Sequence, residues 1–288
     1  MSILKFDFDF MKLRKLALTI SLVLVITSVV LLLTRGLNLG IDFTGGNVIQ
    51  VEFEKRPDVA NVREVISSIV AKGAMIQNFG EKGIIIRTNE DTEESREAVV
   101  KTLTSTYTDA KVTGFEKVGP VVGGELRRQA IIGVSIALVA ILIYITLRFQ
   151  FRFAVVSVVP LVHDVLIALG FFSITQMEIS SSFIAAILTI VGYSLNNTII
   201  ILDRVRENWG SLSRKGIVKL VNESLNQTLG RTINTTLTTL FPVIALCVWG
   251  GPVLAAFSYA MLVGIFAGTW SSMFVATGLL CEWQGKKN

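Results

Sequence analysis

Residues Phe183–Leu202 read FIAAILTIVGYSLNNTIIIL, a run of 20 residues without a charged side chain. An α-helix rises about 1.5 Å per residue, so about 20 apolar residues cross the ~30 Å hydrocarbon core of a bilayer. The run therefore has the length and composition of a transmembrane helix. It also carries two adjacent asparagines, Asn196 and Asn197, where hydrocarbon is expected, and it is followed directly by Asp203.

Five further apolar runs of similar length occur along the chain of 288 residues, which is 51% hydrophobic and only 17% charged. This composition predicts a membrane all-α bundle of six transmembrane helices. The net charge of +5 follows from basic connections between the spans, so no nucleic-acid partner is expected. The five further runs are Leu16–Leu33, Ala130–Leu147, Ala154–Thr175, Thr232–Trp249 and Leu254–Leu280.

The basic residues indicate how the spans are oriented. Six Lys and Arg residues occur from Arg204 to Arg231, around the connection between the fourth and fifth spans, whereas the connections at 176–180 and 250–252 contain none. Short cytoplasmic connections carry an excess of Lys and Arg, so we expect both termini in the cytoplasm and the segment 36–126 on the outer side. No signal-peptide cleavage site occurs between the first span and Arg35. We therefore expect the first span to be an uncleaved membrane anchor.

The segment between the first and second spans has the pattern of a soluble α+β domain. Apolar side chains alternate along Asn47–Glu54 as in a half-buried strand, and after Pro57 their spacing becomes that of an amphipathic helix. We expect the ferredoxin-like order β-α-β-β-α-β, with strands at 47–54, 74–79, 83–88 and 110–118 and helices at about 59–70 and 92–107. The predicted parts of the chain are the cytoplasmic N-terminus with the first span at 1–35, the extracytoplasmic domain at 36–126, and the remaining spans with a cytoplasmic C-terminus at 127–288.

Ionisable and amide side chains inside spans are costly, about 3 kcal/mol for a charged group, so they indicate a function or a partner. We expect the polar residues of the middle spans to form an intramembrane polar network. The candidates are His163 and Asp164 in the third span, Asn196, Asn197 and Asp203 in the fourth, and Arg231, Asn234 and Thr235 in the fifth.

Depth places Arg231 near the asparagines. If the fourth span ends near Asp203 and the fifth begins near Asn226, Asn197 and Arg231 lie about 9 Å and about 7.5 Å inside, respectively. Polar residues of the fifth span recur every three or four positions, which predicts a face turned away from lipid. We therefore predict that Arg231 faces Asn196 and Asn197 inside the bundle.

Plainer interpretations of these residues remain open. Arg231 could extend to the headgroups as an anchor, and the asparagines could only join helices by hydrogen bonds. The His163 and Asp164 pair could be a satisfied structural contact.

Three further patterns concern structure. Gly264, Gly268 and Ser272 form a ridge of small residues that lets another helix approach closely. Residues Gly216–Leu225 have the amphipathic pattern of a short helix along the inner interface. Asp42, between glycines, has the pattern of a turn residue rather than a catalytic acid.

No pattern typical of an enzyme or a cofactor site is present in the sequence. There is no nucleotide-binding glycine loop, no nucleophile with a base and no metal-ligand spacing. The two cysteines, Cys247 and Cys281, are too few for a disulfide framework or a metal site. We therefore expect neither catalysis nor a cofactor or metal.

Five motifs in order resemble the SecF family, the smaller membrane subunits of the bacterial SecDF accessory translocase. The resemblance implies one half of an RND-superfamily transporter in the bacterial cytoplasmic membrane. It also implies partnership with SecD and the SecYEG channel, and use of the proton-motive force to move a translocating polypeptide, with Arg231 as the fixed charge of a proton-responsive centre. The motifs are GIDFTGG at 40–46, VGPVVGGEL at 118–126, HDV at 163–165, NNT leading into DRVREN at 196–208, and LNQTLGRTINTTLTTL at 225–240.

One position departs from the family pattern. Where the family reads Asn-Asp-Thr, this chain reads Asn196-Asn197-Thr198, so the carboxylate expected at 197 is missing. Asn has nearly the shape of a protonated Asp but cannot release a proton. The substitution either locks one state or makes the chain rely on Asp164 or on a partner subunit. Two other functions stay open: an RND-like pump for a small molecule or lipid, and a structural scaffold for SecD.

Overall fold

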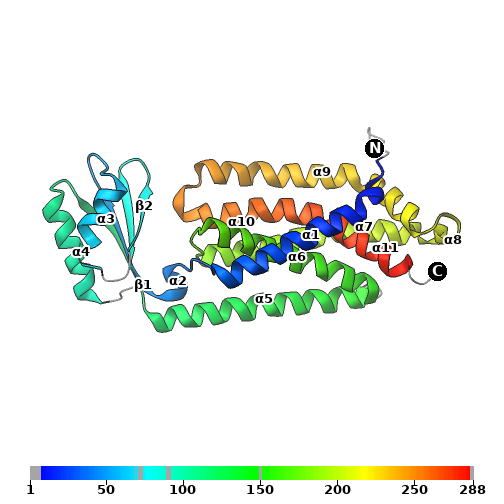
Figure 1. The fold of residues 1–288 in the computed structure, drawn as a ribbon, viewed down its shortest axis with the longest axis horizontal. Helices are drawn as coiled ribbons and strands as arrows, with labels where there is room; N and C mark the ends of the chain where they lie inside the picture. Colours follow the sequence, from blue (N-terminus) through cyan, green and yellow to red (C-terminus); the bar gives the residue numbers. More distant parts are fainter. Residues whose placement is uncertain (1–7, 68, 71–73, 89–91, 149–150, 286–288) are drawn as a thin grey trace.

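The computed structural model describes residues 8–67, 69–70, 74–88, 92–148 and 151–285, which form a long helical bundle with a small sheet domain at one end (Figure 1). In these residues, six helical segments are long and apolar enough to cross a membrane, which confirms the six predicted spans. Helices satisfy every backbone hydrogen bond within one segment, which lipid requires. The six segments are Phe10–Thr34, Val121–Leu147, Phe151–Thr175, Ser181–Lys215, Ile217–Trp249 and Val253–Gln284.

The sixth span differs from a regular helix. It consists of α10 (Gly251–Trp270), a π-helical segment η3 (Ser271–Ala276) and α11 (Thr277–Gly285). Such π-helical segments are rare and are frequently found at functional sites. The other bundle helices are α1 (Arg14–Thr34), α5 (Pro120–Arg148), α6 (Phe151–Thr175), α7 (Ser181–Glu207) and α9 (Ile217–Trp249), with shorter segments η1 (Phe10–Leu13), α2 (Ile41–Thr44), η2 (Asn208–Ser211) and α8 (Leu212–Lys215).

The prediction of a separate interfacial helix at Gly216–Leu225 is wrong. These residues begin α9, which continues without a break through the fifth span. Leu220, Val221 and Leu225 are buried in one cluster with residues of α7. The apolar stripe that suggested a membrane surface therefore packs on a neighbouring helix instead.

The sheet domain has the predicted element order β1-α3-β2-β3-α4-β4. Its antiparallel strands lie in the order β2-β3-β1-β4, which approximates the ferredoxin-like arrangement. One face packs on α3 and α4 through a core that includes Ile49, Val51 and Ile84. The other face, with Val48 and Ile85, looks towards the bundle. The bounds are β1 Gly46–Glu52, α3 Val59–Ser67, β2 Met75–Phe79, β3 Gly83–Thr88, α4 Glu93–Thr106 and β4 Lys111–Val118.

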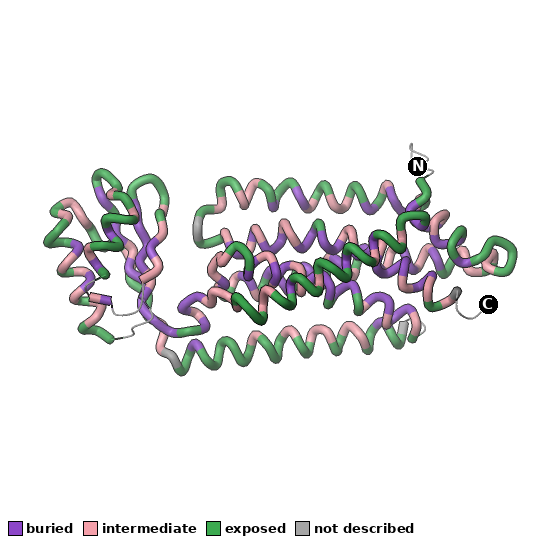
Figure 2. Tube along the Cα trace, in the orientation of Figure 1, coloured by how far each residue is buried: buried purple, intermediate pink, exposed green. Residues whose placement is uncertain are grey.

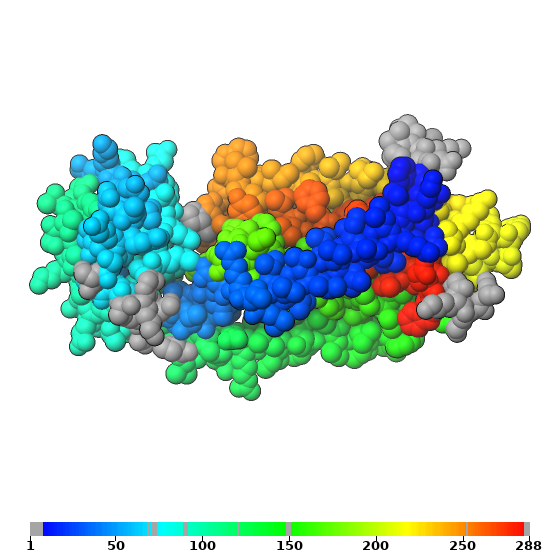
Figure 3. Space-filling view, in the orientation of Figure 1, coloured from blue at the N-terminus to red at the C-terminus, as the bar shows by residue number. Residues whose placement is uncertain are grey.

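Burial is concentrated in the centre of the bundle. Figure 2 shows buried residues along α6, α7 and α10, whereas α5 is exposed along most of its length. Helix α1 crosses one face of the bundle diagonally, from the end that carries α11 to the sheet domain (Figure 3). Since the exposed side chains of α1 and α5 are mostly apolar, these surfaces suit contact with lipid or another membrane subunit.

The predicted ridge of small residues packs α10 against α7. A Cβ on Gly264 would lie 2.3 Å from Ile190 Cγ1, and one on Gly268 would lie 3.0 Å from Ser194 Cβ. Only glycine allows the two backbones to approach this closely, so the ridge sets the position of the helix that continues into η3.

Candidate functional site

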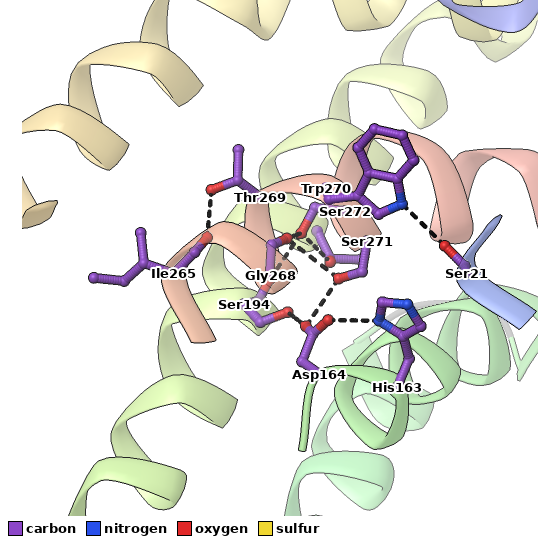
Figure 4. Close-up of polar contacts among 11 residues, drawn as sticks. Ser21, His163, Asp164, Ser194, Ile265, Gly268, Thr269, Trp270, Ser271 and Ser272 are labelled. Carbon is purple, nitrogen blue, oxygen red and sulfur yellow. Dashed lines mark hydrogen bonds and ion pairs between the residues drawn. The ribbon is translucent and has the colours of Figure 1, made fainter. Parts of the chain in front are cut away.

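Asp164, at mid-length of α6, is the centre of a buried polar cluster (Figure 4). Its side chain is 1% exposed. Ser194 of α7 donates to Oδ2 at 2.6 Å, and Ser271 of η3 donates to the same oxygen at 2.8 Å. His163 Nδ1 lies 2.8 Å from the other oxygen, Oδ1. A carboxyl group in the apolar interior is therefore joined to side chains from two further elements.

The π-helical turn brings its serines to this cluster. Ser271 and Ser272 are the first residues of η3, and both hydroxyls also donate to the Gly268 carbonyl, at 3.2 and 2.6 Å. Ser272 donates to the Ser194 carbonyl at 3.3 Å and lies 2.9 Å from the Thr198 hydroxyl. Hydroxyl groups thus join η3 to α7 both through the carboxyl group of Asp164 and directly.

The cluster also holds polar atoms that the described residues leave unpaired. His163 Nε2 is buried without a hydrogen-bond partner among the described residues, and so are both amide atoms of Asn197, which is 0% exposed. Asn197 follows Ser194 by three residues and therefore lies on the same side of α7. His163 Nε2 and the Asn197 amide are therefore free, among the described residues, to form further hydrogen bonds.

A second polar site lies at the other side of α7. A cleft of about 530 Å³ between α7 and α9 is lined by Asn196, Asp203, Arg204 and Arg231, among others. Asp203 forms an ion pair with Arg206 at 2.7 Å. Arg231 is exposed, and no described residue forms an ion pair with it.

The prediction that Arg231 faces both asparagines holds for one of them only. Arg231 shares the cleft with Asn196, whereas Asn197 is fully buried and makes no hydrogen bond to Arg231. Adjacent residues of a helix point about 100° apart, so the two amides cannot serve one site. The eight predicted residues therefore do not form one network: His163 and Asp164 lie in the buried cluster, Asn197 is buried on the same side of α7 as Ser194, and Asn196, Asp203 and Arg231 line the cleft, whereas Asn234 and Thr235 belong to neither site.

The polar stripe of α9 was expected inside the bundle, and this expectation is wrong for the single chain. Arg231 and Asn234 are exposed and Thr235 is half-buried. The Thr235 hydroxyl bonds to the Arg231 and Thr232 carbonyls of its own helix, which satisfies it locally. A polar surface remains on the outside of a membrane-spanning helix.

Sequence analysis missed three polar side chains of the buried cluster. The hydroxyl groups of Ser194, Ser271 and Ser272 form these hydrogen bonds. In the sequence, however, the three serines are recognisable only as small residues within a span. The ridge pattern indicated close packing at Ser272, but not a carboxyl group on the facing helix. In the described part of the chain, no group of three His, Cys, Asp or Glu side chains is placed to hold a metal ion.

Two family models match the chain. Residues 98–286 match the model described as protein export membrane protein SecD/SecF, C-terminal, and residues 30–55 match the SecD/SecF GG motif. The second match contains the GIDFTGG motif, and the first contains both polar sites.

Curated relatives and solved structures are similar over nearly the whole chain. The protein translocase subunit SecF of Desulfurispirillum indicum is 42% identical over 96% of this chain and 91% of its own length, and that of Magnetococcus marinus is 43% identical over 95% and 91%. The crystal structure of SecDF from Thermus thermophilus, described as a translocon-associated membrane protein, matches 99% of this chain with a TM-score of 0.90 and 37% identity. This chain spans 40% of the length of that SecDF chain.

Proposed function

The chain belongs to the SecD/SecF family of protein-export membrane proteins, and on this premise we propose that it is a SecF-type subunit of a proton-driven export complex. It works with a SecD subunit and the SecYEG channel to promote passage of polypeptides through the cytoplasmic membrane. The sheet domain lies on the outer side and both termini lie in the cytoplasm, in agreement with the basic connections.

The observation that carries the proposal is the carboxyl group of Asp164 in the middle of the bundle. Three side chains from three elements converge on it, so a change in its protonation alters contacts of α6, α7 and η3 together. A charge that crosses the membrane delivers about 2.3 kcal/mol per 100 mV, which is enough to bias an equilibrium between two states that differ by a few kcal/mol. Asp164 then supplies the proton-carrying group that Asn197 cannot supply.

The exposed stripe of α9 supports a membrane partner. Arg231 and Asn234 would be costly against lipid, so a second subunit that covers them removes this cost. We assign this face, together with the cleft at Asn196, to the SecD subunit, and expect a carboxylate of that subunit opposite Arg231. A stand-alone pump is not favoured, because the chain matches a subunit family over nearly its whole length.

The test is Asp164→Asn in the complex with SecD and SecYEG, reconstituted in vesicles. Asn keeps the shape of the aspartic acid side chain, and its carbonyl oxygen can still accept hydrogen bonds from Ser194 and Ser271. Its amide group cannot bind and release a proton as a carboxyl group does. Assembly should be normal, and the export component that depends on an imposed proton gradient should be lost. Glu125→Gln, an exposed carboxylate at the outer end of α5, is the matched control. Unchanged gradient-dependent export in Asp164→Asn would overturn the proposal and leave the scaffold role.

A further inference from the structure

The connection between α6 and α7 holds the sheet domain on the bundle. Gly40 donates to the Ile179 carbonyl at 2.8 Å, and Ile179 donates to the Asn38 carbonyl at 2.9 Å, which pairs the two backbones in parallel. The Asn38 side chain donates to the Gln176 carbonyl at 2.9 Å. The linker that enters the sheet domain is therefore bound to a loop of the membrane bundle.

An ion pair joins the sheet itself to the same loop. Arg87 Nη1 of β3 lies 3.0 Å from Glu178 Oε2, and the two side chains are only 18% and 13% exposed. Gln77 of β2 accepts from Arg87 at 2.9 Å and orients the guanidinium. The pair lines a cleft of about 310 Å³ between the face of the sheet opposite α3 and α4 and the outer ends of the bundle helices.

Two further details show that this contact is closely fitted. A Cβ on Gly40 would lie 2.5 Å from Glu178 Oε1, so any larger residue displaces the carboxylate. Asp42 Oδ2 accepts from the Ser181 backbone N–H at 2.6 Å, and Ser181 is the first residue of α7. An acid at a helix N-terminus is stabilising, so the motif predicted to form a turn also caps a transmembrane helix.

We propose that Arg87 and Glu178 form a latch that fixes the sheet domain on the bundle and transmits relative movement of α6 and α7 to it. Both helices leave the loop that carries Glu178, and the Asp164 cluster joins the same two helices about 17 Å further along. A shift of α6 against α7 therefore moves Glu178, and Arg87 carries the movement into β3. Glu178 and Arg87 are positioning residues. The docking contact itself does not depend on the proposed function, but its consequence for polypeptide export does.

The experiment measures the position of the domain directly. Spin labels are attached at Lys101 of α4 and at Leu33 of α1, both exposed, in the SecD complex after replacement of Cys247 and Cys281. Distances between the labels are measured without a proton gradient. Arg87→Glu and Glu178→Arg each place like charges together and should raise the undocked fraction by about tenfold, since breaking a largely buried pair is costly.

The charge-swapped double variant, Arg87→Glu with Glu178→Arg, should restore the distance distribution of the unsubstituted protein. Arg128→Glu is the control, because it breaks an exposed pair with Glu125 on α5 and should change nothing. The inference is overturned if either single charge reversal leaves the distance distribution unchanged. It is also overturned if both single reversals shift the distribution and the double variant fails to restore it, while circular dichroism shows that the sheet domain is still folded. Neither result bears on Asp164, whose test is export, so failure of the latch and failure of the proposed function are distinguishable.

Discussion

Substitution of Gly264 by Ala tests the packing that positions the buried cluster. The added Cβ would lie 2.3, 2.4 and 2.8 Å from Cγ1, Cδ1 and Cγ2 of Ile190. Carbon atoms pack at about 3.5 Å or more, so α10 and α7 must separate by about 1.2 Å. Overpacking of this kind costs about 1–3 kcal/mol, whereas Ala gains at most ~1 kcal/mol over Gly in a helix, so the net change is a loss of up to about 2 kcal/mol.

The same displacement should lengthen the bond from Ser271 to Asp164, now 2.8 Å, because η3 continues α10. We therefore expect Gly264→Ala to lower both the free energy of unfolding and gradient-dependent export. Unfolding is followed by tryptophan fluorescence in increasing SDS, and export in vesicles that contain the SecD complex and SecYEG.

Ile190→Ala removes all three clashing atoms and makes the test specific. Alone it leaves a cavity that costs about 2–5 kcal/mol, but in the double variant the Cβ at 264 partly fills that cavity. The two changes should therefore be non-additive by about 1 kcal/mol or more. Gly192→Ala is the control, since no atom lies within 4 Å of its Cβ position. Additive effects, or a Gly264→Ala variant as stable as the control, would refute the packing argument.

Three further outcomes are expected. Burial raises the pKa of Glu178 above its ordinary 4.5, Arg87 lowers it and Asp42 raises it, with the net effect upward; Glu116 lines the same cleft. Because docking raises this pKa, the docked state takes up a proton and should be most stable below pH 4.5, where the neutral carboxyl group can still accept a hydrogen bond from Arg87. Docking should weaken as pH rises through the raised pKa, and Glu178→Gln should abolish this dependence in the spin-label distances. Asn197→Asp should enhance proton-linked export while lowering stability by about 1–3 kcal/mol, because no described residue donates to position 197; export that stays unchanged over a range of proton-motive force removes a role for this position. Arg231→Leu should leave SDS stability of the isolated chain within about 0.5 kcal/mol, since the side chain is exposed, but reduce copurification with SecD; equal copurification argues against a partner on α9.

The sequence was sufficient to predict the helices and strands, but not to predict which neighbour each side of a helix faces. Spans were predictable because each needs only length and hydrophobicity, and the sheet domain because alternation along Asn47–Glu54 indicates a strand. The strand β1 is buried on both faces, however, and not half-buried as predicted, because its second face lies towards the bundle. Asp164 was predictable as a candidate site because an acid inside a span is costly. The orientation of Asn196 and Asn197 was not, because it depends on how α7 rotates against its neighbours.

The remaining misses have the same physical origin. Ser194 and Ser271 both reach Asp164 because Gly264 and Gly268 allow α10 to lie close to α7. The latch was missed because Glu178 and Arg87 are far apart in sequence, and each has the pattern of an ordinary surface charge. Contacts between elements cannot be read from the periodicity of either element alone.

Helix α7 takes part in all three polar contacts, and this bears on the choice between a motor subunit and a scaffold. Its inner face binds Asp164 through Ser194, its outer face lines the cleft of Arg231, and its N-terminus is capped by Asp42 beside the latch. A helix is nearly rigid, so a change at any one contact displaces the other two. A scaffold needs none of these contacts to be polar, since apolar packing would hold the subunits at less cost. One helix therefore contacts a titratable group on α6, a cleft that contains a cation of α9, and the segment that leads into the sheet domain, and this arrangement favours a moving part.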